Sequence, residues 1–112
     1  MRILFVEDDK SLQRATVRMI RLARENAEVL LAQTYDEAVA HLTASPELDL
    51  VLCDYNLIGS KTGGDVLEWI KANRFELVPR FVFLSANDVV KKLHDRCLVK
   101  PCAPEDIRAL LR

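Results

Sequence analysis

The sequence predicts an α/β domain of the doubly wound kind, in which helices cover both faces of a parallel sheet. Short aliphatic runs without polar alternation, such as residues 3–6 and 50–53, are typical of strands buried on both faces. Strand-like runs alternate with segments of helical periodicity five times along the chain. Acidic residues directly follow two of these runs, which places polar chemistry at the ends of strands.

The first predicted strand, residues 3–6, leads into a helix whose apolar positions recur at intervals of three and one. Asp9 is the expected N-cap of this helix, because its carboxylate can accept hydrogen bonds from free backbone N–H groups. The expected inward positions are Leu12, Ala15, Thr16, Met19, Ile20 and Ala23. A second strand over residues 29–34 precedes a helix around residues 38–42, which ends before Ser45-Pro46.

The third strand, residues 50–53, ends at Asp54, and a loop over residues 55–62 leads into a helix that starts at Gly63-Gly64 and ends near Asn73. The fourth strand covers residues 81–84, the fifth covers residues 98–99, and the last helix begins at Pro104. Residues 87–95 remain for a helix between the last two strands, which allows two turns or so at about 3.6 residues per turn. We therefore expect that fourth helix to be shortened.

The chain has 112 residues, which is the size of one domain, residues 1–112. Its 16 basic and 17 acidic side chains give a net charge of −1, and no basic run indicates direct binding of nucleic acid. The sequence has no leader-like start and no stretch long enough to span a bilayer, which predicts a cytoplasmic protein without a membrane partner. Cys53, Cys97 and Cys102 lack C-x-x-C spacing, so we expect reduced thiols.

The acids Glu7, Asp8 and Asp54 carry the strongest indication of function. In doubly wound sheets, ligands bind beyond the carboxyl ends of the strands, and these residues fall there. Neighbouring carboxylates raise one another's pKa unless a hard cation with oxygen ligands shares the site. The sequence therefore predicts a divalent metal site, with Mg²⁺ as the best candidate.

Together with Ser85 after the fourth strand and Lys100-Pro101 after the fifth, these acids resemble the receiver domain of two-component response regulators. The resemblance covers the whole chain, with each motif residue closing a strand in the right order. It implies the flavodoxin-like strand order 2-1-3-4-5 and a cis peptide before Pro101. It also implies that Asp54 accepts a phosphoryl group from a histidine kinase or a histidine phosphotransfer protein.

The resemblance further implies a division of labour among the site residues. The implied ligands of Mg²⁺ are Glu7 through water, Asp8, Asp54 and the backbone carbonyl of Asn56. Lys100 would contact one phosphoryl oxygen as a point charge, and the Ser85 hydroxyl would donate to another. Such a domain is a regulatory switch rather than an enzyme, and its output domain or partner protein is not identified by the sequence.

Two departures from the receiver pattern leave alternatives open. Ile58 stands where receivers often have proline, in a loop about one residue longer than usual, and Cys97 stands where many have an aromatic residue. The missing aromatic residue and the shortened fourth helix favour a second hypothesis, a receiver-like interaction module that works without phosphorylation. A phosphatase of the haloacid-dehalogenase kind is a third, but it needs an aspartate nucleophile after the first strand, which Glu7-x-Asp9 does not supply.

Overall fold

The computed structural model describes residues 1–86, 92 and 94–112. Within that part of the chain, five parallel strands form one sheet in the order β2-β1-β3-β4-β5, which confirms the predicted topology. The strands are β1 (Arg2–Val6), β2 (Glu28–Ala32), β3 (Leu50–Asp54), β4 (Phe81–Ser85) and β5 (Cys97–Val99). β1 and β3 are neighbours in the interior of the sheet, so their carboxyl ends lie side by side.

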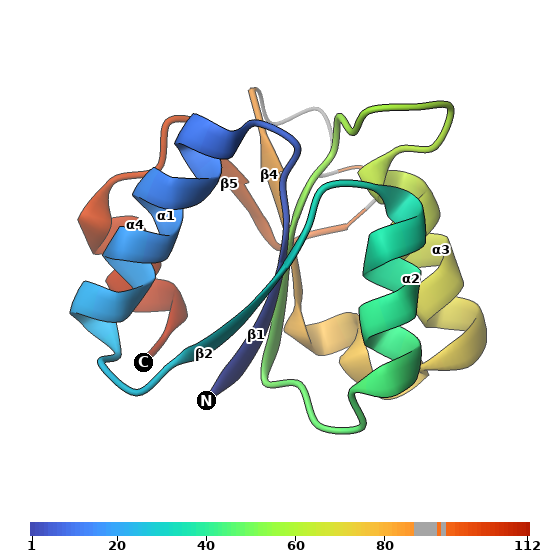
Figure 1. The fold of residues 1–112 in the computed structure, drawn as a ribbon, viewed down its shortest axis with the longest axis horizontal. Helices are drawn as coiled ribbons and strands as arrows, with labels where there is room; N and C mark the ends of the chain where they lie inside the picture. Colours follow the sequence, from blue (N-terminus) through green and yellow to red (C-terminus); the bar gives the residue numbers. More distant parts are fainter. Residues whose placement is uncertain (87–91, 93) are drawn as a thin grey trace.

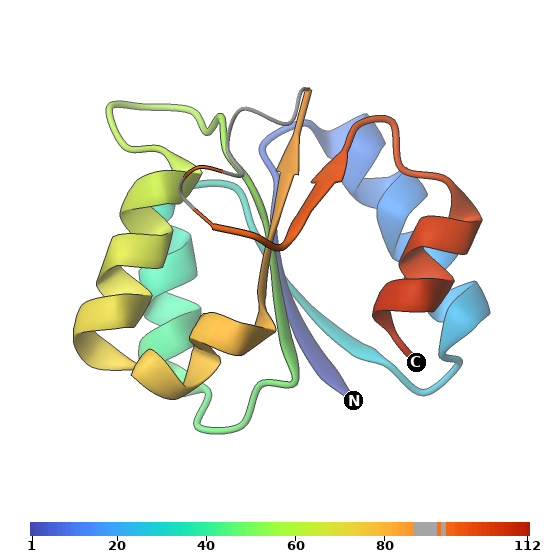
Figure 2. The ribbon, with the colours of Figure 1, turned by 180° about the vertical axis from the view of Figure 1, so that it is seen from behind.

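Helices cover both faces of this sheet (Figure 1). One side carries α1 (Lys10–Ala23) and α4 (Pro104–Leu110), and the other carries α2 (Tyr35–Ala44) and α3 (Gly63–Asn73). A 3₁₀ helix that the sequence did not predict, η1 (Phe75–Arg80), joins α3 to β4. The view from behind shows β4 and β5 between the same two helical layers (Figure 2). The predicted short helix over residues 87–95 falls mostly outside the described residues.

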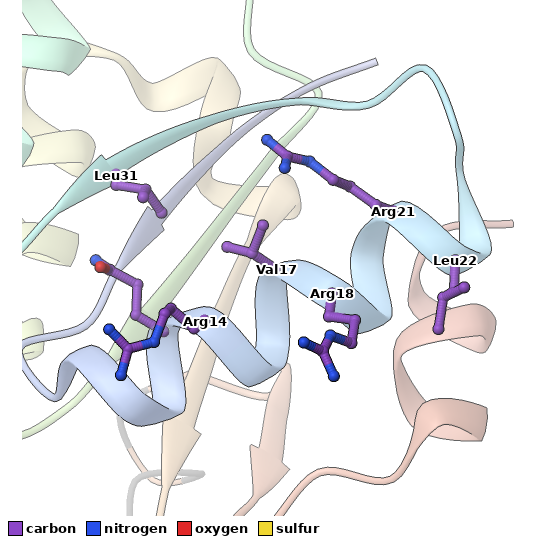
Figure 3. Close-up of a pocket in the computed structure, with 7 residues that line it drawn as sticks. Arg14, Val17, Arg18, Arg21, Leu22 and Leu31 are labelled. Carbon is purple, nitrogen blue, oxygen red and sulfur yellow. The ribbon is translucent and has the colours of Figure 1, made fainter.

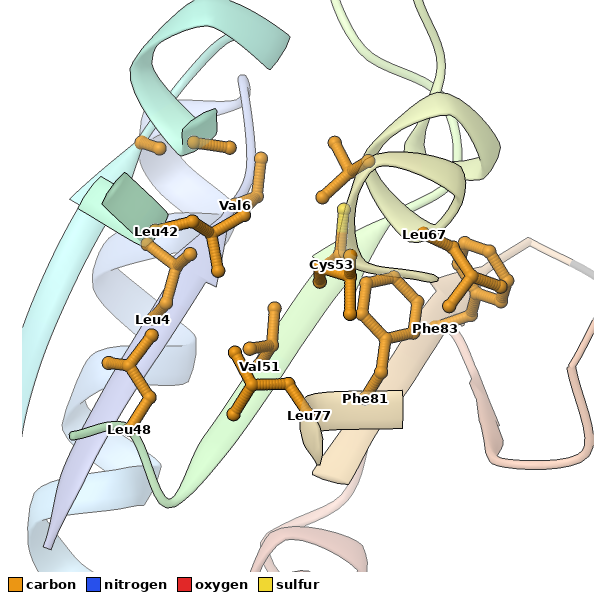
Figure 4. Packing of buried hydrophobic residues seen from close by; sticks show 14 residues of the cluster. Leu4, Val6, Leu42, Leu48, Val51, Cys53, Leu67, Leu77, Phe81 and Phe83 are labelled. Atoms are coloured by element: carbon orange, nitrogen blue, oxygen red, sulfur yellow. The ribbon is translucent and has the colours of Figure 1, made fainter. Parts of the chain in front are cut away.

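The apolar runs supply both halves of the core, as predicted. Alternate residues of a strand point to opposite faces, so a continuous apolar run fills both layers. Every residue of β3 and β4 is buried. The cluster under α2 and α3 is shown in Figure 4 and includes Leu4, Val6, Val51, Cys53, Phe81 and Phe83. The cluster under α1 and α4 includes Ile3, Phe5, Leu50, Leu52, Val82 and Ile107.

Helix α1 begins as predicted, but its inward face is rotated. The Asp9 carboxylate accepts hydrogen bonds from two backbone N–H groups at 2.9 and 3.0 Å, which confirms it as the N-cap. The buried residues of α1 are Gln13, Thr16 and Ile20. Leu12, predicted to point inward, is 39% exposed. Gln13 lies inward instead because its side-chain amide donates to the Glu7 carbonyl oxygen at 3.2 Å, a contact that a hydrophobic pattern cannot indicate.

The second strand is shifted from its predicted range. β2 starts at Glu28 and ends at Ala32, because Thr34 serves as the N-cap of α2 and accepts a hydrogen bond from the Glu37 N–H at 3.1 Å. Cys53, Cys97 and Cys102 form no disulfide bond in the structure. The part of the chain that the structure describes contains no candidate membrane-spanning helix.

Candidate functional site

The carboxyl ends of β1 and β3 bring the predicted acids together. Val6 pairs with Cys53 in the sheet, so Glu7 and Asp54 are the next residues on adjacent strands. Glu7 and Asp54 are buried, whereas Asp8 is half-buried. Glu7, Asp8 and Asp54 each offer one carboxylate oxygen, and these oxygens lie within 4.8 Å of one another. The predicted acidic cluster is therefore present, with the spacing that a shared cation requires.

Lys100 places a positive charge inside this cluster. Its Nζ lies 2.9 Å from Glu7 Oε1 and 3.0 Å from Asp54 Oδ2. Burial by itself would lower the pKa of Lys100, but the hydrogen bonds and negative charges of Glu7 and Asp54 outweigh it and raise that pKa. The ammonium therefore stays charged and neutralises part of the acidic site.

The position of Lys100 is set by the end of β5. Its backbone N–H donates to the Ser85 carbonyl oxygen at 2.7 Å, which ties it to the end of β4. The Lys100-Pro101 peptide is cis, as the resemblance implied. Ser85 itself is buried and follows Leu84, which pairs with Asp54. The strand ends therefore bring Ser85 and Lys100 to the same edge of the sheet as the acids.

Asp8 is the acid that Lys100 does not pair with. Burial is the largest cause that raises the pKa of Asp8, followed by a hydrogen bond with Glu7 and the negative charge of Glu7. A backbone hydrogen bond and the positive charge of Lys100 offset this rise only in part. An Asp8 carboxylate beside Glu7 is thus costly to ionise in the absence of a further cation. A hard cation with oxygen ligands would remove that cost, so the donor set fits Mg²⁺.

Asn56 contacts the cluster through its backbone. Its N–H donates to Asp54 Oδ1 at 3.3 Å, which orients the carboxylate from the side of the loop that follows β3. The residue is otherwise exposed. All the residues predicted for the site therefore lie at this one end of the sheet.

Gly63 positions the site in a way that sequence reasoning missed. A Cβ atom at this residue would lie 2.3 Å from the Asp54 carbonyl oxygen and 2.9 Å from the Tyr55 Cα. The Gly63 N–H also donates to the Tyr55 carbonyl oxygen at 2.6 Å. Glycine is needed here because the start of α3 packs directly on the backbone at the end of β3. The pair Gly63-Gly64 was noticed in the sequence, but only as the start of a helix.

A capping box fixes where α3 starts. The Thr62 side chain accepts a hydrogen bond from the Gly64 N–H at 3.1 Å, and the Asp65 carboxylate accepts one from the Thr62 N–H at 2.7 Å. The long loop after β3 thus ends at a defined residue, which sets the close approach of Gly63 to Asp54.

The family model of the response regulator receiver domain matches residues 3–112. The chain belongs to this family. Receiver domains of two-component systems are regulatory domains that act as phosphorylation switches, are phosphorylated on an aspartate, and generally bind Mg²⁺ in an acidic pocket. They generally interact with histidine kinases or phosphotransfer proteins and with output domains. The dehalogenase-like phosphatase hypothesis is thereby rejected.

Solved structures of receiver domains are similar to this receiver. The non-phosphorylated HemR receiver domain of Leptospira biflexa has 27% identity and a TM-score of 0.77, with 98% of this chain and 90% of that chain covered. A receiver domain protein of Methanospirillum hungatei has 25% identity, a TM-score of 0.77, and coverages of 98% and 89%. A putative response regulator of Chloroflexus aurantiacus shares the fold at 20% identity, with a TM-score of 0.84 and coverages of 99% and 98%. No curated protein matches the chain.

Proposed function

We propose that this receiver is switched by transfer of a phosphoryl group from a histidine kinase or histidine phosphotransfer protein to Asp54. The observation that carries the proposal is the buried Asp54 carboxylate, with the Lys100 ammonium 3.0 Å away and two further acids beside it. Phosphoryl transfer asks the protein mainly for positioning and for charge stabilisation, and a carboxylate nucleophile needs cations to offset the phosphoryl oxygens. The cluster supplies the nucleophile, one cation and ligands for another.

The remaining residues have roles that follow from their chemistry. Asp8 and Asp54 would bind Mg²⁺ directly, with Glu7 acting through water and the Asn56 carbonyl as a further ligand. When bound, Mg²⁺ would neutralise phosphoryl oxygens at Asp54. Lys100 would exchange its contact with Asp54 for one with a phosphoryl oxygen, and the Ser85 hydroxyl would donate to another.

Intact mass spectrometry after incubation with acetyl phosphate and Mg²⁺ tests the assignment. We expect one phosphoryl group on the wild type, removed by hydroxylamine as an acyl phosphate is, and none on Asp54→Asn. The control is Asp36→Asn, which removes an exposed carboxylate from the first turn of α2 and should leave phosphorylation unchanged. Equal phosphorylation of Asp54→Asn and the wild type would show that Asp54 is not the acceptor.

Removal of Asp8 is expected to weaken Mg²⁺ binding. Loss of a residue that only supports a metal ligand lowers metal affinity by about 10–100-fold. Asp8→Ala removes a ligand itself, so its affinity for Mg²⁺ should fall by at least that factor. Amide chemical shifts during a Mg²⁺ titration measure the affinity. In the wild type, affinity should fall as the pH is lowered through the raised pKa of Asp8, because protons then compete with the metal.

Asp9→Ala provides the matched control for the Mg²⁺ titration. It removes the adjacent carboxylate, which caps α1, and should cost about 1 kcal/mol of stability without changing the affinity for Mg²⁺. Unchanged affinity in Asp8→Ala would contradict the proposed ligand set.

A second candidate function, an interaction module that works without phosphorylation, is favoured by one observation. Cys97 stands at the β5 position where the resemblance implies an aromatic residue, and it is partly buried against the core under α2 and α3. The acyl phosphate measurement separates the two functions, because such a module would not be phosphorylated under any of these conditions.

A further inference from the structure

Helix α1 carries an uneven share of positive charge. Between Lys10 and Ala23 it contains Lys10, Arg14, Arg18 and Arg21 and no acidic residue, although the whole chain has a net charge of −1. Arg14, Arg18 and Arg21 follow one another at intervals of four and three, so they share one side of the helix. All three are exposed.

Arg14, Arg18 and Arg21 have no carboxylate partner in the part of the chain that the structure describes. Within the described residues, Arg2, Arg74 and Arg108 each form a salt bridge with a glutamate, whereas none is formed along this side of α1. Three neighbouring unpaired guanidinium groups repel one another, and an acidic partner would relieve that repulsion.

The arginines border an apolar groove between α1 and the edge strand β2 (Figure 3). The groove has a volume of about 480 Å³, and its apolar lining consists of Val17, Leu22 and Leu31. Leu22 is 82% exposed and Leu31 is 42% exposed. In Figure 3, Arg21 extends from α1 toward β2, and Arg14 and Arg18 lie along the same stretch of helix. Exposed leucines in the same groove as unpaired arginines match a partner that is both acidic and apolar.

We propose that the groove between α1 and β2 docks an acidic amphipathic segment of a partner protein. Carboxylates of the segment would pair with Arg14, Arg18 and Arg21, and its aliphatic side chains would cover Leu31 and Val17. Nucleic acid fits the groove less well, because binding through phosphates does not use exposed leucines. A membrane surface fits less well, because the apolar face of α1 is already packed on the sheet, whereas a membrane-bound amphipathic helix inserts that face into lipid. The proposal does not depend on phosphorylation of Asp54.

The test titrates the receiver with a synthetic amphipathic helix that has a glutamate face and a leucine face, and follows amide chemical shifts. We expect shifts along α1 and β2 and an affinity that falls as salt is added. Arg14→Gln/Arg18→Gln/Arg21→Gln should bind about tenfold more weakly, because exposed ion pairs each contribute a fraction of this effect. Leu31→Ser should also weaken binding, and Asp54→Asn should bind as the wild type does.

The matched control is Lys61→Gln/Lys71→Gln/Arg80→Gln, which removes three exposed positive charges from the opposite side of the sheet and should leave the affinity unchanged. If both triple variants weakened peptide binding equally, the effect would come from net charge alone, and the proposal would be overturned. Tighter binding of duplex RNA or of anionic lipid vesicles at the same face would also overturn the proposal. Self-association of the wild type that the α1 triple variant abolishes would overturn it as well, because the groove would then bind a second copy of the chain.

Discussion

Gly63→Ala is expected to destabilise the domain by about 3 kcal/mol, at the upper end of the usual cost of overpacking. The new Cβ would lie 2.3 Å from the Asp54 carbonyl oxygen. Because the opposing atoms belong to the backbone of a fully buried strand, no side-chain rotation relieves the overlap, and either α3 or the end of β3 must move. Urea denaturation followed by circular dichroism measures the loss.

The same substitution should also slow phosphorylation of the protein that remains folded. Displacement of the Asp54 and Tyr55 backbone would shift the Asp54 carboxylate relative to the Lys100 ammonium, now 3.0 Å away. Misplacement of reacting groups by an ångström is costly in rate. The rate of acetyl phosphate labelling, measured where the variant is still folded, tests this part.

Gly59→Ala is the control for steric overlap. Gly59 has φ of +103° but no atom within 4 Å of its hypothetical Cβ, so alanine there strains the loop backbone without pressing on Asp54. We expect a loss of about 1 kcal/mol and a nearly normal labelling rate. If Gly63→Ala matched the wild type in both stability and labelling, the close packing of α3 on β3 would not constrain the site.

Lys100→Met should destabilise the metal-free protein by about 3 kcal/mol. Removing one partner of a buried ion pair leaves an uncompensated charge, and here two buried carboxylates, Glu7 and Asp54, would face each other. We place the value at the lower end of the range for buried pairs because the Lys100 side chain is 21% exposed. Urea denaturation in the presence of EDTA gives the loss, and Mg²⁺ should stabilise the variant more than it stabilises the wild type.

The pH dependence of this pair has a definite sign. The ordinary lysine pKa is 10.5, and that of Lys100 is raised in the folded protein. Its stabilising contribution is therefore fully present below pH 10.5 and is lost as the pH rises through the raised value. The stability difference between the wild type and Lys100→Met should therefore shrink as the pH rises through the raised pKa of Lys100.

Lys71→Met is the control for loss of a lysine from an ion pair. Lys71 lies 3.8 Å from Glu68 on the exposed side of α3, where such pairs contribute about 0–1 kcal/mol. Equal stability losses in the two lysine variants, or a Lys100→Met loss that Mg²⁺ does not reduce, would show that Lys100 is not the counter-charge of the cluster.

The amino-acid sequence by itself determined the five strands, the α-helices that cover them and the end of the sheet where the site lies. The aliphatic runs at residues 3–6 and 50–53 indicated strands buried on both faces, and the structure has them as β1 and β3. Asp9 was predictable as an N-cap because capping is a local interaction between residues a few positions apart. The acids could be placed together because the strands are parallel and end at the same edge of the sheet, and because the predicted strand order makes β1 and β3 neighbours.

Tertiary structure decided what depends on contacts between distant segments. The rotation of α1 follows from the contact of the Gln13 side-chain amide with the Glu7 carbonyl oxygen. A repeat of apolar residues predicts the helix, but it does not indicate which polar side chain will find a buried partner. The Lys100 ammonium meets Glu7 across 93 positions of sequence, and Gly63 meets the Asp54 backbone only because the capped loop returns to β3. The arginines of α1 were visible as residues, but their groove exists only because β2 packs beside that helix and exposes Leu31. Local sequence patterns predict helices and strands, whereas the packing of these elements on one another sets the distances of a few ångströms between their side chains.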